Sequence, residues 1–229
     1  MSRSRTLALA LAAAFTAACH PPARTAAPTS PTPASASGTR GPSPPRAGGA
    51  SDTSANLIPV GYGSLRQDDI ALRMTQFGLQ VRALPLDESV IRVLSPDSYR
   101  TLRELIASQR DRLDEIRRRN GLSSLSLWYI SFFGVEQGET RFSPMEVIVA
   151  NVGRNFRPVD VIPLSPSFGL QRLRQREAQH GLYVFDGQVD VNQPLVISYE
   201  TVSNSDWPTI LQRIERERAL VRSRMRDRR

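Results

Sequence analysis

Apolar and polar positions alternate in two short stretches near the start of the region that begins at Asn56. Apolar residues occupy every second position over residues 70–74 and again over residues 79–83. This is the period of a β-strand with one buried face. Pro85 and the Asp-Glu-Ser cluster after it interrupt the pattern, and residues 90–94 predict a further strand.

More strands are predicted in the second half of the chain. Residues 125–135 are rich in aromatic and β-branched side chains, and similar but shorter runs cover 146–152, 156–164 and 195–202. Turn residues separate these runs at intervals of roughly ten residues, which favours a sandwich or a barrel.

A hairpin is expected between residues 170–175 and residues 182–185. The segment between them contains His180 and Gly181 and is therefore predicted to be a loop.

Two helices are predicted, one within the series of strands and one at the C-terminal end. Ser95-Pro96 places a capping residue before a proline at the first helical position, and Asn120-Gly121 can end the helix, so it is expected near 96–119. The second helix is expected near 207–226, after Ser205-Asp206. Its narrow apolar stripe is expected to pack on the sheet or, alternatively, against a partner helix.

These elements predict one β-rich globular domain over residues 56–229. The expected fold is mainly β with two helices. It is an antiparallel β-sandwich that could be immunoglobulin-like, with an inserted helix near 96–119 and a C-terminal helix near 207–226.

The N-terminal residues have the features of a secretory signal peptide. Two arginines precede an apolar run over residues 7–15, and Thr16-Ala17-Ala18 then precede Cys19, which is the only cysteine of the chain. Small residues before a cysteine resemble the lipobox of bacterial lipoproteins, and this resemblance covers about the first twenty residues. It implies cleavage after Ala18 and a lipid on Cys19 that anchors the chain to a membrane. The alternative is an ordinary signal peptide, which would leave a free thiol.

The resemblance also bears on location and on domain organisation. His20, and not Asp, follows the cysteine, and by resemblance this implies the outer membrane of the cell envelope. Residues 19–55 are almost entirely Pro, Ala, Ser, Thr, Gly and Arg, a composition that cannot bury a core and predicts a disordered tether. The chain is then a signal peptide (1–18), a lipidated tether (19–55) and a domain (56–229).

The net charge of +8 does not predict nucleic-acid binding, because the excess charge lies outside the domain core. From Asn56 onward there are 25 Arg against 21 Asp and Glu, and the final stretch 222–229 alone holds five Arg against one Asp. Without that stretch the domain is neutral, so no basic surface for phosphate contacts is indicated.

The sequence contains few candidate catalytic or metal-binding residues. His180 is the one histidine outside the tether, and a Ser-His-Asp triad would have to use it as the base. Asp186, Asp190 and Asn192 could line a calcium site, but a turn role is the stronger interpretation of these residues. No cofactor is expected, and a hydrolase remains a weak alternative.

Two groups of residues are candidates for contact with a partner or ligand. Strand alternation places Trp128, Ile130 and Phe132 on one face, with Tyr129 and Phe133 on the other, so that one set forms the core and the other could be an exposed patch. The candidate contacts are Trp128, Tyr129 and Phe133 on this strand and Arg222, Arg224 and Arg226 at the C-terminal end.

These observations favour a non-catalytic adaptor or structural protein of the cell envelope. It would be anchored to the membrane through Cys19 and would dock an envelope protein through its sheet or its C-terminal helix. The alternative is a module that binds a lipid, a glycan or a polysaccharide, for which the aromatic face or the arginines would supply the contacts.

Overall fold

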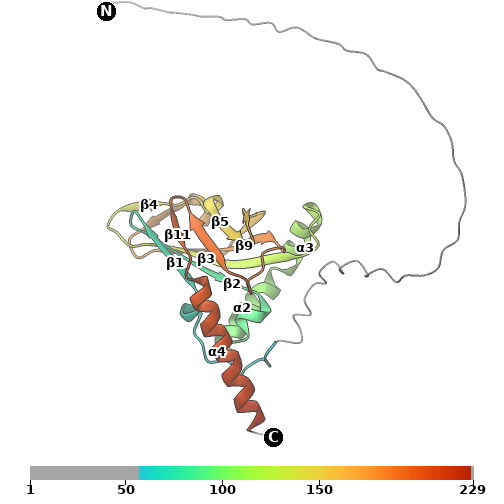
Figure 1. Ribbon diagram of the computed structural model, residues 1–229. Coiled ribbons are helices and arrows are strands. Elements are labelled where there is room, and N and C mark those ends of the chain that lie inside the picture. Colours follow the sequence, from blue (N-terminus) through green and yellow to red (C-terminus); the bar gives the residue numbers. More distant parts are fainter. Residues whose placement is uncertain (1–56, 228–229) are drawn as a thin grey trace, which may run out of the picture. The chain divides into compact units, whose positions relative to one another are not determined.

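The computed structural model describes residues 57–227, which form a mainly β structure with helices (Figure 1). The predicted signal peptide, the predicted tether and Cys19 lie outside the described residues. Within the described part of the chain, the strands are β1 Leu72–Gln76, β2 Leu79–Pro85, β3 Leu125–Gly134, β4 Glu139–Arg141, β5 Val147–Asn151, β6 Arg154–Phe156, β7 Asp160–Pro163, β8 Arg172–Arg174, β9 Ala178–Asp186, β10 Leu195–Tyr199 and β11 Val202–Asn204. The α-helices are α1 Glu88–Ile91, α2 Pro96–Ser108, α3 Arg110–Arg119 and α4 Trp207–Arg226.

The strands form antiparallel sheets. A five-stranded sheet has the order β1-β2-β3-β9-β7, a four-stranded sheet has the order β11-β10-β5-β6, and β4 pairs with β8. The alternating stretches of the sequence lie on β1, β2 and β10, and the aromatic run from residue 125 is β3. The predicted antiparallel β class is therefore confirmed.

The alternation along β3 determines which of its side chains are buried. Trp128, Ile130 and Phe132 of β3 have no exposed surface, as the alternation predicted for one of the two faces. The Phe132 ring lies 5.6 Å from the ring of Tyr199 on β10, which joins the five-stranded sheet to the four-stranded sheet. This aromatic core positions both sheets.

The opposite face of the five-stranded sheet is also covered in part. Leu84 and Tyr129 are paired across β2 and β3, so they share a face, and Leu84 is completely buried. Helices α2 and α3 bury Leu102 and Ile116, and Arg119 of α3 forms an ion pair with Asp160 of β7 at 2.6 Å. The helices thus pack on the side of the sheet that faces away from the aromatic core.

The single helix predicted near 96–119 is wrong, because the structure has two helices there. The chain leaves helical geometry at Gln109, which has φ −104° and ψ 7°, and the Gln109 N–H donates to the Ile106 carbonyl at 3.2 Å. Neither Gly nor Pro marks this break, and the spacing of apolar residues continues across it. The sequence therefore gives no sign that the helix is divided. The described residues contain four α-helices in place of two.

The strand predicted at 90–94 is also wrong. This segment holds the end of α1 and the turn after it, and the Asp87 carboxylate caps the helix by accepting from the Ser89 N–H at 2.8 Å. Val90, Ile91, Val93 and Leu94 are completely buried. A short apolar run of this kind fits a buried helix turn as well as a strand.

Strand pairing differs from the prediction in the last third of the sheet region. Strand β8 pairs with β4 and not with residues 182–185, and His180 and Gly181 lie inside β9 and not in a loop. Residues 156–164 contain two separate strands, of which β6 pairs with β5 and β7 pairs with β9. These pairings join segments distant in sequence, which local patterns do not encode.

Helix α4 packs on its own domain. Trp207, Ile210, Ile214 and Val221 are buried, and the Trp207 indole N–H donates to the Val191 carbonyl at 2.8 Å. Farther along the helix, the Arg218 guanidinium donates to the Ser89 carbonyl at 2.5 Å. The apolar stripe predicted at 207–226 is therefore used within the chain.

Candidate functional site

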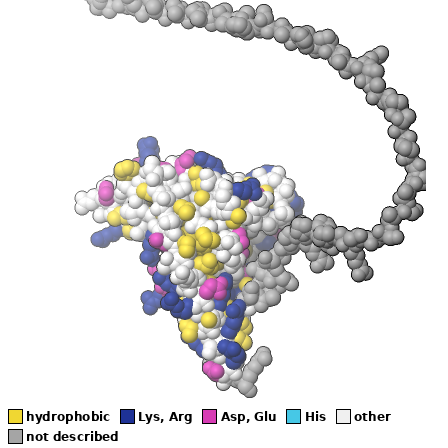
Figure 2. Space-filling model, viewed as in Figure 1, with side chains coloured by type: hydrophobic (Ala, Val, Ile, Leu, Met, Phe, Trp, Pro, Cys, Tyr) yellow, Lys and Arg dark blue, Asp and Glu magenta, His cyan; other side chains and the backbone are white. Residues whose placement is uncertain are grey.

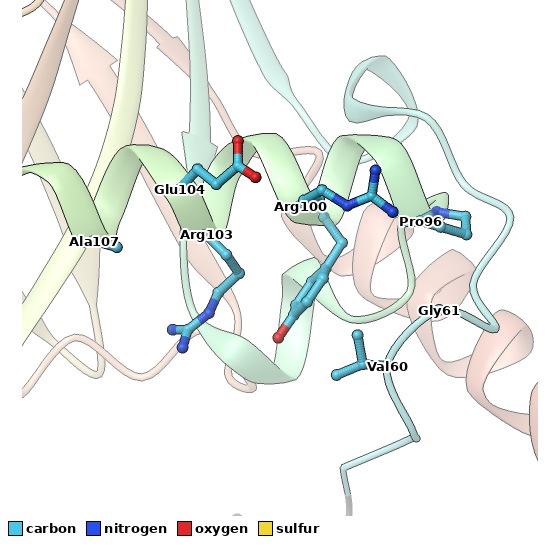
Figure 3. A pocket seen from close by; sticks show the side chains of 8 residues that line it. Val60, Gly61, Pro96, Arg100, Arg103, Glu104 and Ala107 are labelled. Carbon is cyan, nitrogen blue, oxygen red and sulfur yellow. The ribbon is translucent and has the colours of Figure 1, made fainter.

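A groove of about 500 Å³ lies between α2 and the chain segment near residue 60. Figure 3 shows side chains of α2 along one side of it and Val60 and Gly61 on the neighbouring segment. We call it the α2 groove. Its lining residues are Val60, Gly61, Pro96, Tyr99, Arg100, Arg103, Glu104 and Ala107.

Helical periodicity places the α2 residues of the groove on one face. Positions 96, 99, 100, 103 and 107 recur every three or four residues, whereas the buried Leu102 lies on another face. Pro96 suits the first helical turn because the amide hydrogen that proline lacks has no helical partner there. One side of α2 thus anchors it to the domain and the other remains open to a ligand.

The other wall of the groove is held in place by backbone contacts. Leu65 forms two backbone hydrogen bonds with the segment that precedes α2. The Ser95 N–H donates to the Leu65 carbonyl at 2.9 Å, and the Leu65 N–H donates to the Val93 carbonyl at 3.1 Å. Gly63 lies so close to Val93 that a Cβ atom would come within 2.2 Å of its carbonyl. Any larger residue at position 63 would therefore displace this wall.

The charges of the groove are organised by Glu88, which lies behind it on α1. Its carboxylate accepts from Arg92 at 2.7 Å and pairs with Arg103 at 2.8 Å, while the Tyr99 hydroxyl lies 3.3 Å away. Burial and the adjacent Glu88 carboxylate raise the pKa of the Tyr99 phenol, which therefore stays a neutral hydrogen-bond donor. Arg103 and Tyr99 are held in fixed positions by this network.

Arg100 is the more available cation of the groove. Its one ion pair in the described residues is to Asp97 at 3.6 Å, and both side chains are mostly exposed. An exposed pair of this geometry contributes little and opens easily. The α2 groove therefore combines apolar surface from Val60, Pro96 and Ala107 with a guanidinium group that can take an anionic partner.

The structure separates the aromatic residues predicted as contacts. Trp128 is 0% exposed, lies 6.5 Å from the Trp207 ring and donates from its indole N–H to Ser126, so it belongs to the core and is not a surface contact. Tyr129 and Phe133 lie on the other face and are half-buried. The ring of Tyr129 stacks on that of His180 at 5.5 Å.

His180 lies in a polar row across the five-stranded sheet. Ser131 of β3 pairs with Arg82 on one side and with His180 on the other. Burial and the Arg82 charge lower the pKa of His180, and its buried Nδ1 atom has no hydrogen-bond partner within residues 57–227. A catalytic triad needs a carboxylate to orient the imidazole ring, and Nδ1 receives none here.

The arginines predicted as contacts lie near the end of α4, where Arg224 projects from a different side of the helix than Arg222 and Arg226. Arg222, Arg224 and Arg226 are exposed, and Arg224 pairs with Glu217 at 3.7 Å. Figure 2 shows basic side chains gathered over this part of the helix. They lie on a different element from Tyr129 and Phe133, so the sequence-predicted contacts do not form one site.

The acidic residues considered for calcium have turn roles. The Asp190 carboxylate accepts from the Asn192 N–H at 2.9 Å, and that of Asp186 accepts from the Gln188 N–H at 3.0 Å. Within residues 57–227 no group of three or more His, Cys, Asp or Glu side chains could hold a metal ion. The four α-helices of this region are each too short or too polar to span a bilayer.

The sequence did not indicate a site at Tyr99, Arg100 and Arg103. Tyr99 fits the apolar side of the helix, where it packs against the core, and the two arginines fit a solvated helix face. Only the packing of residues 60–61 beside α2 makes them a groove. The comparisons add no relative to this description: no protein-family model, no curated protein and no solved structure matches the chain.

Proposed function

We propose that this protein is a non-catalytic adaptor of the cell envelope, which binds a segment of a partner envelope protein in the α2 groove. The observation that carries the proposal is the composition of that groove, in which apolar walls surround the exposed guanidinium of Arg100. This chemistry fits a partner segment that places an apolar residue beside an acidic one.

Anchoring to a membrane through a lipid on Cys19 is part of the proposal, as is location at the outer membrane. The signal peptide pattern and the position of the only cysteine support it. Mass spectrometry of the N-terminal peptide tests it, because a lipidated Cys19 carries the added mass of acyl chains. An unmodified thiol would mean a freely secreted protein.

The finer fold assignment is also proposed. The five-stranded and four-stranded sheets would be the two layers of an antiparallel sandwich, and the ring contact between Phe132 and Tyr199 supports this arrangement. An immunoglobulin-like order of strands stays a prediction.

Site-specific photo-crosslinking in cells tests the adaptor function. A photoreactive amino acid at Ala107 lies in the α2 groove, and one at Arg112 on the exposed surface of α3 is the matched control. We expect a discrete envelope-protein adduct from position 107 alone, and we expect Arg100→Glu to abolish it because a glutamate would repel an acidic segment.

The same experiment can overturn the proposal. Identical adducts from positions 107 and 112, or an adduct that survives Arg100→Glu, would exclude the α2 groove as the docking site. Adducts to lipid or polysaccharide at position 107, without a protein, would replace the adaptor by the alternative binding module.

A further inference from the structure

The turn between β1 and β2 contains a residue that folding alone does not explain. Gln76 pairs with Leu79, so the turn consists of Phe77 and Gly78, whose φ angles are 42° and 72°. Two-residue turns with two positive φ angles favour Asn followed by Gly. A phenylalanine with positive φ is strained, and Phe77 is 84% exposed, so it gains almost nothing from burial.

A second turn provides an internal comparison. Val152 and Gly153 join β5 to β6 with φ angles of 49° and 71°, and Val152 is 68% exposed. Val152 therefore shares the strain and the exposure of Phe77. Phe77 also borders a pocket.

That pocket is acidic. It has a volume of about 340 Å³ and brings together the carboxylates of Glu136, Glu139 and Glu200 with a single lining cation, Arg141, while Glu139 also pairs with Arg172 at 3.4 Å from outside the lining. Such a volume is at the lower end of the range for ligand sites, roughly 300–1,000 Å³. We call it the Phe77 pocket.

Hydrogen bonds hold the loops around the Phe77 pocket. The Val135 N–H donates to the Gly78 carbonyl at 2.7 Å, and the Gln76 side chain donates to Glu200 at 3.0 Å. Val135 is itself exposed, which extends the apolar surface beside Phe77. The three carboxylates repel anionic lipid head groups. Together with the aromatic ring of Phe77, they suit a segment that carries both cations and an apolar side chain.

The C-terminal end of this chain has that chemistry. Leu220 is an exposed apolar residue, and the stretch 222–229 that follows it holds five Arg against one Asp. Strand β4, which contributes to the Phe77 pocket, and the C-terminal end of α4 lie at opposite ends of the described domain (Figure 1). The contact would therefore join two molecules.

We propose that the Phe77 pocket binds the arginine-rich C-terminal end of a second copy of this chain. The guanidinium groups meet the carboxylates of Glu136, Glu139 and Glu200, and Phe77 packs against the exposed Leu220 of the incoming helix. The contact is head-to-tail, because donor and acceptor are different surfaces, and it can therefore continue from copy to copy. It does not depend on the α2 groove.

Disulfide trapping of the full-length chain tests this contact, because Cys19 is the only natural cysteine. Two differently tagged chains are co-expressed, one with Val135→Cys and the other with Arg226→Cys, and mild oxidation is followed by non-reducing electrophoresis. The matched control pairs Val152→Cys with Arg226→Cys. A chain without an engineered cysteine reports any dimer formed through Cys19 itself.

We expect a mixed dimer from the first pair and its loss in the control pair. Phe77→Asn, which places a favoured residue in the turn and should raise the urea midpoint of unfolding, should abolish the mixed dimer although the fold is stabilised. Glu136→Arg on one chain, or Arg228→Glu with Arg229→Glu on the other, should also abolish it, and combining these charge exchanges should restore it.

Equal trapping in the control pair, trapping that persists with Phe77→Asn, or a failure of the combined charge exchange to restore the dimer would overturn the proposal. The absence of any mixed dimer would overturn it as well. Binding of vesicles that contain anionic phospholipid through residues 222–229, in that event, would assign the arginines to a membrane surface.

Discussion

His180 lies on the half-buried face of β9, stacked on Tyr129 and beside Arg82. Desolvation and the Arg82 charge disfavour the imidazolium form, so the pKa of His180 in the folded protein lies below its ordinary value of 6.5. The same environment that makes this residue a poor general base makes it a reporter of folding.

Acidification should therefore weaken the fold through His180. As the pH falls through about 6.5, the unfolded chain takes up a proton that the folded chain resists, so the free energy of unfolding decreases toward the lower folded pKa. Above pH 6.5 both states are neutral and the contribution vanishes. Urea unfolding at pH 5 and pH 7 should show this loss, and His180→Phe, which keeps the ring stack, should reduce it. An unchanged pH dependence in the variant would contradict the assignment.

Single residues were predicted from the sequence where alternation alone determines their side of a strand. The separation of Trp128, Ile130 and Phe132 from Tyr129 and Phe133 is of this kind, since successive strand residues face opposite ways. Which face is the core depends on the second sheet, which lies far away in sequence, and on how α2 and α3, which precede β3 directly, pack on it. For that reason Trp128 could not be distinguished from Tyr129 as a contact residue.

At the scale of elements, α4 shows how a helix with many charges is fixed to its domain. Its arginine at position 218 is buried, pairs with Glu215 and donates to the Ser89 carbonyl of α1. Glu217, also buried, accepts from the backbone and side chain of Ser64 at 3.1 and 2.8 Å. These polar contacts therefore add to the packing of Trp207 in holding α4 against the domain.

Removing the Arg218 charge should cost stability. Arg218→Met keeps the apolar stem but leaves the Ser89 carbonyl without this donor, so the free energy of unfolding should fall by about 1–3 kcal/mol. Arg216→Met on the exposed side of α4 is the matched control and should change it by less than about 0.5 kcal/mol. Urea midpoints measure both variants, and equal effects would show that the Ser89 contact carries no stability.

Helices and strands were predicted correctly where the local sequence marks them, and incorrectly where packing against a distant segment determines the structure. The C-terminal helix at 207–226 is confirmed, because an apolar stripe marks it in the sequence, although Asp206 makes no side-chain cap hydrogen bond. The break at Gln109 has no Gly or Pro to announce it, and the buried run at 90–94 fits either a strand or a helix turn. The α2 groove needed residues 60–61 placed beside α2, and no sequence period encodes that contact.

For the molecule as a whole, two buried tyrosines limit the stability of the fold at alkaline pH. Burial raises the pKa of Tyr183 and of Tyr199 well above the ordinary value of 10.0, and the hydrogen bond from the Ser143 N–H only partly opposes this for Tyr199. Both rings contact Phe132 in the aromatic core.

Stability should therefore fall as the pH rises above about 10. The unfolded chain loses phenolic protons there, whereas the folded chain keeps them on Tyr183 and Tyr199, so unfolding is increasingly favoured. Near-ultraviolet absorbance should show these two phenols ionising together with the loss of the fold. Ionisation of all five tyrosines before unfolding would contradict the buried placement.

The bonds that join residues 63–65 to Val93 and Ser95, and Ser64 to Glu217, have a mechanical consequence. A force applied to the chain ahead of residue 57 would reach the domain first at the buried Ile58 and then through this short segment, before any of the sheets. The segment is held both by a single parallel bridge, Leu65 to Leu94, and by α4. If the chain is tethered to a membrane, these few bonds bear the load, and their rupture would open one wall of the α2 groove while the aromatic core stays folded.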